Sequence, residues 1–185
     1  GQALKFDGVD DIVTVGDSAS LDPSVITIST WFKPMNTLSG LDQGLISKWD
    51  ASVNDGWFIE LGHTGANARI FMVGLSIVNW GPTLPVFTAG NWYHFVFTYD
   101  GATKRIYISG IQSASETSTG TLDISNKIIR IGKSEGTDGV SHWFNGSIDD
   151  VRIYNRALSA AEVANLYRSG AAKFAVSPVN ALTKG

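Results

Sequence analysis

Residues 92–110 read WYHFVFTYDGATKRIYISG, and they hold the clearest structural signal in the chain. From Tyr93 to Tyr99 every second residue is aromatic, so these rings fall on one face of a predicted β-strand. Asp100-Gly101 separates this strand from a second apolar run at residues 105–108, and Asp-Gly between two such runs predicts a β-hairpin. Ser109-Gly110 marks the next reversal. The stretch therefore predicts neighbouring antiparallel strands.

Shorter apolar runs with the same two-residue period recur through most of the sequence. They lie at residues 4–6, 12–15, 26–32, 45–48, 57–61, 69–73, 128–131 and 144–154. Pro34 ends the third of them, because proline cannot donate to the ladder of a sheet. Many short strands separated by turn residues predict an antiparallel β-sandwich.

One helix is expected, near the carboxyl end of the chain. Ser159 and Glu162 have the spacing of a capping box, in which each side chain accepts a hydrogen bond from the other residue's backbone. Val163, Leu166 and Tyr167 form the apolar stripe of this helix. Gly170 is placed to end it. We expect a domain over residues 1–170 and an extension or linker over residues 171–185, which show no clear periodicity.

The composition excludes several classes of function. The net charge is −3 and the basic residues are scattered, so a nucleic-acid partner is not expected. No apolar run is long enough to cross a bilayer, so membrane insertion is not expected either. The absence of cysteine excludes disulfides and thiolate metal sites. Because the chain starts at Gly1 without a methionine, we expect an excised module or a mature product.

Three stretches carry a resemblance to a known family. They are ALKFDGVDD at residues 3–11, the strand and turn at residues 92–101, and NGSIDDVRIYNRAL at residues 145–158. Over residues 3–170 the chain resembles the LamG-like jelly-roll family of the concanavalin A-like lectin/glucanase superfamily. The resemblance implies an all-β sandwich of two antiparallel sheets, here with one short C-terminal helix.

The same resemblance implies a secreted binding module, at the cell surface or outside the cell, often with a structural calcium ion. Members of the family bind sugars, proteins or no known ligand. We therefore expect carbohydrate as the partner, and keep a protein-interaction or adhesion domain and a structural spacer as alternatives.

Asp7, Asp149 and Asp150 are the predicted calcium ligands. Ile148 and Val151 fall on opposite faces of their strand, so the two aspartates between them mark a bulge. A buried carboxylate there needs a partner, such as Arg152, a backbone amide or a cation. The family resemblance places calcium between this strand and the N-terminal strand, which adds Asp7. The alternative is that Asp7 and Asp10 only hold the turn at Gly8 through their side chains.

Tryptophan side chains are the predicted sugar contacts, since their rings stack on the C–H faces of sugars. Of the six tryptophans, Trp31 and Trp92 are expected to pack in the core. The others lie beside Gly, Asn, Asp or Ser, in or next to expected loops. The predicted ligand-binding residues are Trp49, Asn54, Asp55, Trp57, Trp80 and Trp143. His142 forms a small cluster with the last of these.

Catalysis is not expected. Glycosidases need two carboxylates about 5–10 Å apart across the scissile bond, and the superfamily's glucanase signature of alternating acids has no match in this chain. Glu60 and the other glutamates stand alone in the sequence. A Gly-x-Ser-x-Gly nucleophile motif is absent, and the three histidines lack metal-ligand spacing. His94 is expected to be a partly buried imidazole with a hydrogen-bond partner.

Overall fold

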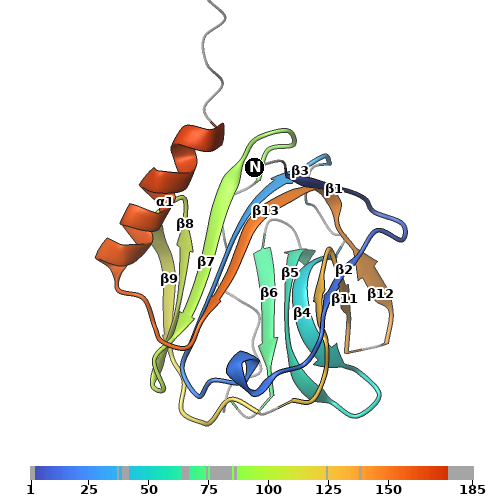
Figure 1. Cartoon of the computed structure of the whole chain (residues 1–185), viewed down its shortest axis with the longest axis vertical. Coiled ribbons are helices and arrows are strands. Elements are labelled where there is room, and N and C mark those ends of the chain that lie inside the picture. Colours follow the sequence, from blue (N-terminus) through green and yellow to red (C-terminus); the bar gives the residue numbers. More distant parts are fainter. Residues whose placement is uncertain are drawn as a thin grey trace, which may run out of the picture.

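Two antiparallel sheets packed face to face form the body of the molecule, as the computed structural model shows (Figure 1). The structure describes residues 3–36, 38, 42–63, 67–73, 75, 85, 87–123, 125–137 and 139–174. The first sheet holds, in spatial order, β1 (Leu4–Asp7), β13 (Asn145–Tyr154), β3 (Ile26–Pro34), β7 (Tyr93–Tyr99), β8 (Thr103–Ile108) and β9 (Ile111–Thr117).

The second sheet and the remaining elements complete the fold. Its strands, in spatial order, are β2 (Val13–Val15), β10 (Ile129–Ile131), β4 (Gln43–Asp50), β5 (Asp55–His63) and β6 (Asn67–Met72). A separate hairpin joins β11 (Lys133–Glu135) to β12 (Ser141–Trp143), a 3₁₀ turn η1 spans Ala19–Leu21, and the helix α1 spans Ala160–Phe174. The predicted two-sheet sandwich with one C-terminal helix is confirmed.

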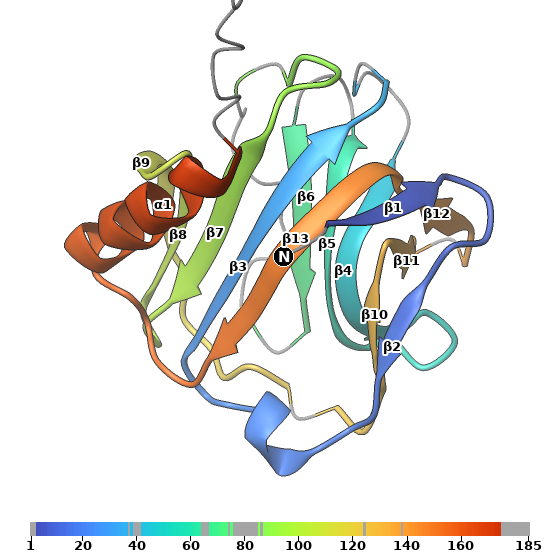
Figure 2. The ribbon, with the colours of Figure 1, turned by 45° about the horizontal axis from the view of Figure 1, so that its top comes forward.

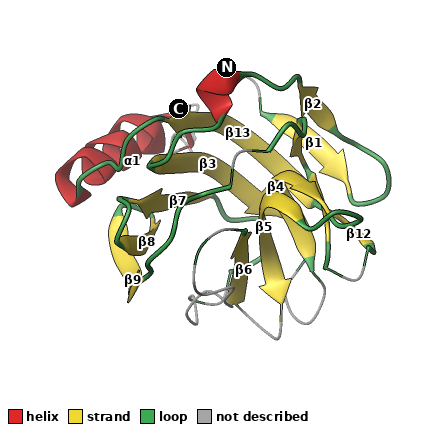
Figure 3. Ribbon diagram, turned by 90° about the horizontal axis from the view of Figure 1, so that it is seen from below, coloured by secondary structure: helices red, strands yellow, loops and turns green. Residues whose placement is uncertain are grey.

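The core lies between the sheets, where alternate residues of each strand meet. Ile28 of β3, Ile59 of β5 and Phe97 of β7 are buried there. A side chain of this kind contributes roughly 1.5–3 kcal/mol when it leaves water. In Figure 3 the two layers are seen edge-on, with α1 against the outer face of the layer that contains β3 and β7. Helix α1 therefore does not cover the outer face of the second sheet.

Two local predictions about the strands are confirmed. Asp100 Oδ1 accepts hydrogen bonds from the backbone N–H groups of Ala102 (2.9 Å) and Thr103 (2.7 Å), which fixes the β7–β8 turn. The register of β13 against β3 shifts between Asp149 and Arg152, as the change of face predicted.

Helix α1 begins as predicted but ends later. The backbone N–H of Ser159 donates to Glu162 Oε2 (2.8 Å), and that of Glu162 donates to Ser159 Oγ (3.3 Å), so the capping box is confirmed. The prediction that Gly170 ends the helix is wrong, because the helix continues to Phe174. Gly170 is needed for close packing instead, since a Cβ atom there would come within 2.5 Å of Trp31 Nε1.

The last helical turn is held by aromatic contacts. The ring of Phe174 lies 4.6 Å from that of Trp31 and 4.3 Å from that of Trp92, measured between centroids. Trp31 is buried, as expected, whereas Trp92 is only half-buried. Residues 175–185 of the predicted extension lie outside the described residues. Figure 2 shows α1 running beside β7 and β8.

Strands β9, β11 and β12 were not among the predicted strands. All residues of β9 are exposed or half-buried, and most of its residues are polar. Strands β11 and β12 are three residues long each and consist mainly of polar residues, so none of the three strands has an apolar period. Within the described part of the chain, no helix is both long and apolar enough to cross a membrane.

Candidate functional site

An open groove lies where the β11–β12 hairpin meets the turns at one end of the sandwich. Its volume is about 490 Å³, within the range of small-molecule sites, which is roughly 300–1,000 Å³. It is lined by Gly8, Asn36, Asp42, Gln43, Ser141, His142, Trp143 and Asn145. We call it the Trp143 groove. Most of its lining side chains carry amide, carboxylate, imidazole or hydroxyl groups, and one is a large aromatic ring.

The hairpin is held close to the outer face of the second sheet by a glycine. A Cβ atom at Gly44 of β4 would come within 2.1 Å of the backbone nitrogen of Ser134 in β11, so only glycine permits this approach. Ser47 Oγ donates a 2.9 Å hydrogen bond to the carbonyl of Lys133 nearby. The hairpin therefore crosses β4 rather than extending the sheet.

Glu60 of β5 is buried beneath the hairpin. Alternate residues of β5 face the core between the sheets, so Glu60 points to the outer face together with Phe58. Its side chain has no exposed surface. Glu60 Oε1 accepts a 2.5 Å hydrogen bond from Ser134 Oγ, and lies 2.7 Å from His142 Nδ1. The imidazole of His142 thus connects the buried carboxylate to the groove.

Trp143 forms the aromatic wall of the groove. Its side chain is half-buried, and the ammonium of Lys133 lies 4.7 Å from the centroid of the indole ring. Lys133 also pairs with Glu135 Oε1 at 3.5 Å. The ammonium thus lies over one face of the indole, and the ring borders the groove, where its other face could stack on a ligand.

The opposite wall is built from turns that hydrogen-bond to one another. Gln43 Oε1 accepts a 3.0 Å hydrogen bond from the backbone N–H of Asn145, and the carbonyl of Asn145 accepts one from Met35 N–H (3.0 Å). Gly8, at a φ of +82°, lies so close to Asn145 that a Cβ atom would come within 2.9 Å of that side chain. The groove is therefore shaped before any ligand arrives.

Two of the predicted stacking residues lie in the interior. Trp49 is 1% exposed in β4 and Trp57 is 4% exposed in β5. The expectation that they lie at the surface in or near loops is wrong, because both belong to regular strands. The Trp57 ring joins the core between the sheets, and the Trp49 ring packs on Phe58. Neither offers a face to a sugar.

Of the predicted pair Asn54 and Asp55, Asp55 lies at a second pocket, away from Trp143. Asn54, at a φ of 52°, makes the β4–β5 turn. Asp55 lines a pocket of about 440 Å³ with Asp17, Asp22 and other residues, none of them aromatic. Its Oδ2 accepts a 3.2 Å hydrogen bond from Ser125 Oγ.

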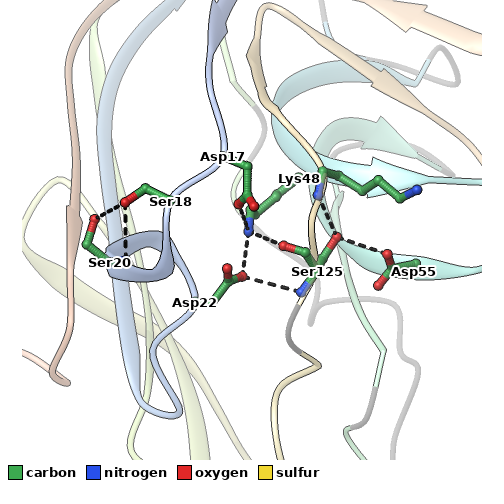
Figure 4. A network of polar contacts seen from close by, with 8 residues as sticks. Asp17, Ser18, Ser20, Asp22, Lys48, Asp55 and Ser125 are labelled. Carbon is green, nitrogen blue, oxygen red and sulfur yellow. Dashed lines mark hydrogen bonds and ion pairs between the residues drawn. The ribbon is translucent and has the colours of Figure 1, made fainter.

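A buried lysine lies at the same second pocket (Figure 4). Lys48 Nζ contacts Asp17 Oδ1 at 2.9 Å and Asp22 Oδ1 at 2.5 Å, and it donates to the carbonyl of Ser125. The Lys48 hydrogen bond is the largest cause that lowers the pKa of Asp17. The arrangement compensates a buried ammonium and ties the segment around η1 to the sheet.

The three predicted calcium ligands are not brought together. Asp7 pairs with Asn145 in the β1–β13 ladder, which places Asp149 four positions along β13, about 13 Å away at 3.3 Å per residue. Asp150 instead pairs with Lys173 (2.6 Å) and Arg152 (3.5 Å), and both bonds lower its pKa, that to Lys173 the more. One ion cannot bridge Asp7 to the other two.

Asp7 joins a different group of acids. Its nearest carboxylates belong to Asp10 and Asp11, and one oxygen from each of the three lies within 4.8 Å of the others. Asp7 Oδ1 also accepts hydrogen bonds from the N–H groups of Val9 (2.8 Å) and Asp10 (3.3 Å), and the Val9 bond is the main cause of its lowered pKa. The turn-holding role considered for Asp7 is therefore present.

Several residues of the groove were not predicted from the sequence. Trp80, which was predicted, lies outside the described residues. Asp42 and Asn36 lie next to strand ends with no motif around them. Glu60 did carry a signal, since it is a lone acid in a strand whose other central residues are apolar. Of the predicted ligand-binding residues that the structure describes, Trp143 alone lines the groove.

Comparison with known proteins assigns the chain to a family. The sequence profile described as the concanavalin A-like lectin/glucanases superfamily matches residues 7–164. None of the curated proteins matches the chain.

Solved structures share the fold at low sequence identity. The binding domain of Paraclostridial Mosquitocidal Protein 1 is 20% identical with a TM-score of 0.68, covering 91% of this chain and 45% of that one. Domain 4 of AbnA, an extracellular arabinanase from Geobacillus stearothermophilus solved in complex with arabinotriose, is 20% identical with a TM-score of 0.62, covering 90% and 82%. The receptor binding domain of botulinum neurotoxin D is 16% identical with a TM-score of 0.65, covering 89% and 43%. The chain thus spans less than half of both toxin chains.

Proposed function

Because the chain belongs to the concanavalin A-like lectin/glucanases superfamily, we propose that it is a carbohydrate-binding module whose ligand occupies the Trp143 groove. The observation that carries the proposal is the half-buried indole of Trp143 bordering a groove lined by amide and carboxylate side chains. An aromatic face supplies stacking, and the polar groups supply hydrogen bonds to hydroxyls. The similar arabinanase domain, solved with arabinotriose, supports the same ligand class.

The alternative of a protein-binding surface has less support. The exposed large apolar residues of the described part, such as Val9, Val53 and Ile111, are spread over different strands and turns. A protein interface is expected to gather apolar side chains into one patch.

We predict that Trp143→Ala weakens glycan binding by about tenfold or more, which corresponds to the loss of roughly 1.4 kcal/mol. The measurement is a glycan array followed by titration of the best ligand. Trp92→Ala is the matched control, since Trp92 is also half-buried and lies 5.4 Å from a lysine ammonium, that of Lys33, but does not line the groove. Equal losses in both variants, or a silent array, would refute the groove as a glycan site.

We also propose that the module is non-catalytic. Asp42 and Glu60 carry carboxylate oxygens within 4.8 Å of each other, which resembles the spacing in retaining glycosidases, about 5–5.5 Å. Glu60, however, is fully buried, and its Oε1 already accepts from Ser134. A nucleophile or acid must reach the glycosidic bond, and this carboxylate does not.

Calcium is proposed for the turn after β1, with Asp7, Asp10 and Asp11 as the residues that would hold it. Three carboxylate oxygens fit the oxygen preference of this ion. Asp149 and Asp150 are too distant to join them. Calcium bound there would stabilise the turn. We predict a calcium-dependent rise in melting temperature that chelation reverses and Asp10→Asn removes; a melting temperature unaffected by both would refute it.

We propose an extracellular or cell-surface location, as part of a larger protein. The similar domain of the arabinanase belongs to an extracellular enzyme, and the family resemblance points the same way.

A further inference from the structure

We propose that Asp42, Glu60 and His142 bind a divalent transition-metal ion, of which zinc is the representative, at the floor of the Trp143 groove. One ligand atom from each of the three lies within 4.8 Å of the others. Asp42 directly precedes β4, Glu60 lies in β5 and His142 lies in the middle of β12, so the fold brings together side chains that are far apart in sequence. The proposal does not depend on the identity of the glycan.

A buried oxygen supplies the second observation. Glu60 Oε2 is fully buried and has no hydrogen-bond partner. The nearest cationic group is the guanidinium of Arg69, whose Nη1 lies 3.7 Å away, beyond hydrogen-bond distance. Arg69 Nη2 meanwhile donates a 2.9 Å hydrogen bond to Thr137 Oγ1. A buried carboxylate oxygen left without a hydrogen bond is costly, so this atom indicates a missing ligand.

The donor set decides the class of metal. One imidazole nitrogen and two carboxylates are ligands that zinc and its neighbours accept, whereas calcium takes oxygen ligands. His142 Nδ1 and Glu60 Oε1 are 2.7 Å apart, a hydrogen-bond distance, so a tetrahedral ion with bonds near 2.0 Å would replace this hydrogen bond and move the two atoms to about 3.3 Å apart. The turn at Asp7 offers carboxylates only, so it suits calcium, whereas the cluster with His142 suits zinc.

The surroundings support a bound cation. Ser134 Oγ donates to Glu60 Oε1 and so orients the carboxylate from outside the cluster. Arg69 offsets part of the negative charge of Glu60, which lowers the expected affinity for a cation. Asp42 and His142 also line the groove, so an ion held by three protein ligands would keep a position open to water or to a sugar hydroxyl.

The test is zinc binding by the full chain after treatment with a chelator, in the absence of sugar. We expect one equivalent of zinc by titration calorimetry, and a melting temperature raised by roughly 5–10 °C when zinc is at about 100 times its Kd. The only three histidines are His63, His94 and His142, and there is no cysteine, so background sites are few.

Variants identify the ligands. His142→Gln and Asp42→Asn should each weaken zinc binding by at least about tenfold, because each removes one ligand. Asp10→Asn is the matched control, since it removes one charge from the separate acidic turn. Glu60→Gln tests the buried ligand directly, because it removes the charge of the carboxylate at the centre of the cluster. If this variant does not fold, Asp42→Asn still tests the site, because Asp42 is only half-buried.

Zinc that fails to bind stoichiometrically, or that binds equally well to His142→Gln and Asp42→Asn, would overturn the proposal. Loss of glycan binding in Trp143→Ala has no bearing on this readout. Failure of the glycan site and failure of the metal site can therefore be told apart.

Discussion

Buried polar side chains in this protein differ in how well they are compensated. Lys48 has carboxylates and a backbone carbonyl around its ammonium, so its charge is satisfied. Glu60 keeps one oxygen without a hydrogen bond. His94 is intermediate, since Nε2 lies 2.9 Å from Ser29 Oγ while Nδ1 has no partner. The expected hydrogen-bond partner of His94 is confirmed, although the side chain is fully rather than partly buried.

His94 gives a pH-dependent prediction. Its pKa is lowered from 6.5 to about 4, mainly by burial and to a smaller extent by the positive charge of Arg152, while Asp150 opposes the shift. The folded protein keeps this imidazole neutral, whereas the unfolded chain takes up a proton below pH 6.5. Its contribution to stability is therefore complete above pH 6.5 and is lost as the pH falls from 6.5 toward 4. The loss amounts to about 3 kcal/mol in the free energy of unfolding.

Urea unfolding of the native chain and of His94→Gln at several pH values between 4 and 7.5 measures this loss. Glutamine can still hydrogen-bond to Ser29 but does not titrate, so the stability of the variant should fall less steeply with acid. The difference between the two chains isolates His94 from the other titrating groups. Parallel curves would show that the folded protein does not hold this imidazole neutral.

Helix α1 packs closely on one indole ring, that of Trp31. Tyr167 stacks on Trp31 with centroids 5.5 Å apart, and Gly170 lets the next turn approach the same indole. In an exposed helix, replacing glycine by alanine stabilises by about 1 kcal/mol. Here the gain is opposed by a clash with a buried ring.

We predict that Gly170→Ala lowers the free energy of unfolding by about 1–2 kcal/mol, because overpacking costs more than the gain in helix propensity. Chemical unfolding measures the change. Ala164→Gly, in the same helix, serves as a control that should destabilise by about 1 kcal/mol through propensity. A more stable Gly170→Ala variant would mean that the helix can move away from Trp31 without penalty.

Elements with local causes could be predicted from the sequence. The β7–β8 turn depends on Asp100 and Gly101, and the start of α1 depends on Ser159 and Glu162, within a few residues in each case. The end of α1 could not be predicted, because it depends on Trp31, which lies far away in the sequence. Because the sequence does not reveal the contact between Gly170 and Trp31, Gly170 is predicted to end the helix.

The Trp143 groove is formed by segments from the whole length of the molecule, and few of its residues could be predicted from the sequence. His142 and Glu60 are 82 positions apart, and they meet only because β11 crosses β4 at Gly44. That crossing depends on the register of several strands, which a single sequence does not reveal. Trp143 was recognisable by residue type alone. Trp49 and Trp57 have the same side chain and similar neighbours in sequence, yet the sheets bury both.

The pairing of β1 with β13 has a consequence for biosynthesis. The first strand of the sheet finds its partner about 140 residues later in the chain. At a synthesis rate of roughly 5–20 residues per second, the ribosome needs about 7–28 s to produce that partner. During this time β1 has neither its ladder nor the turn that packs on Asn145. The nascent chain must therefore carry an unpaired strand, which cellular chaperones can protect, until translation of the domain is nearly complete.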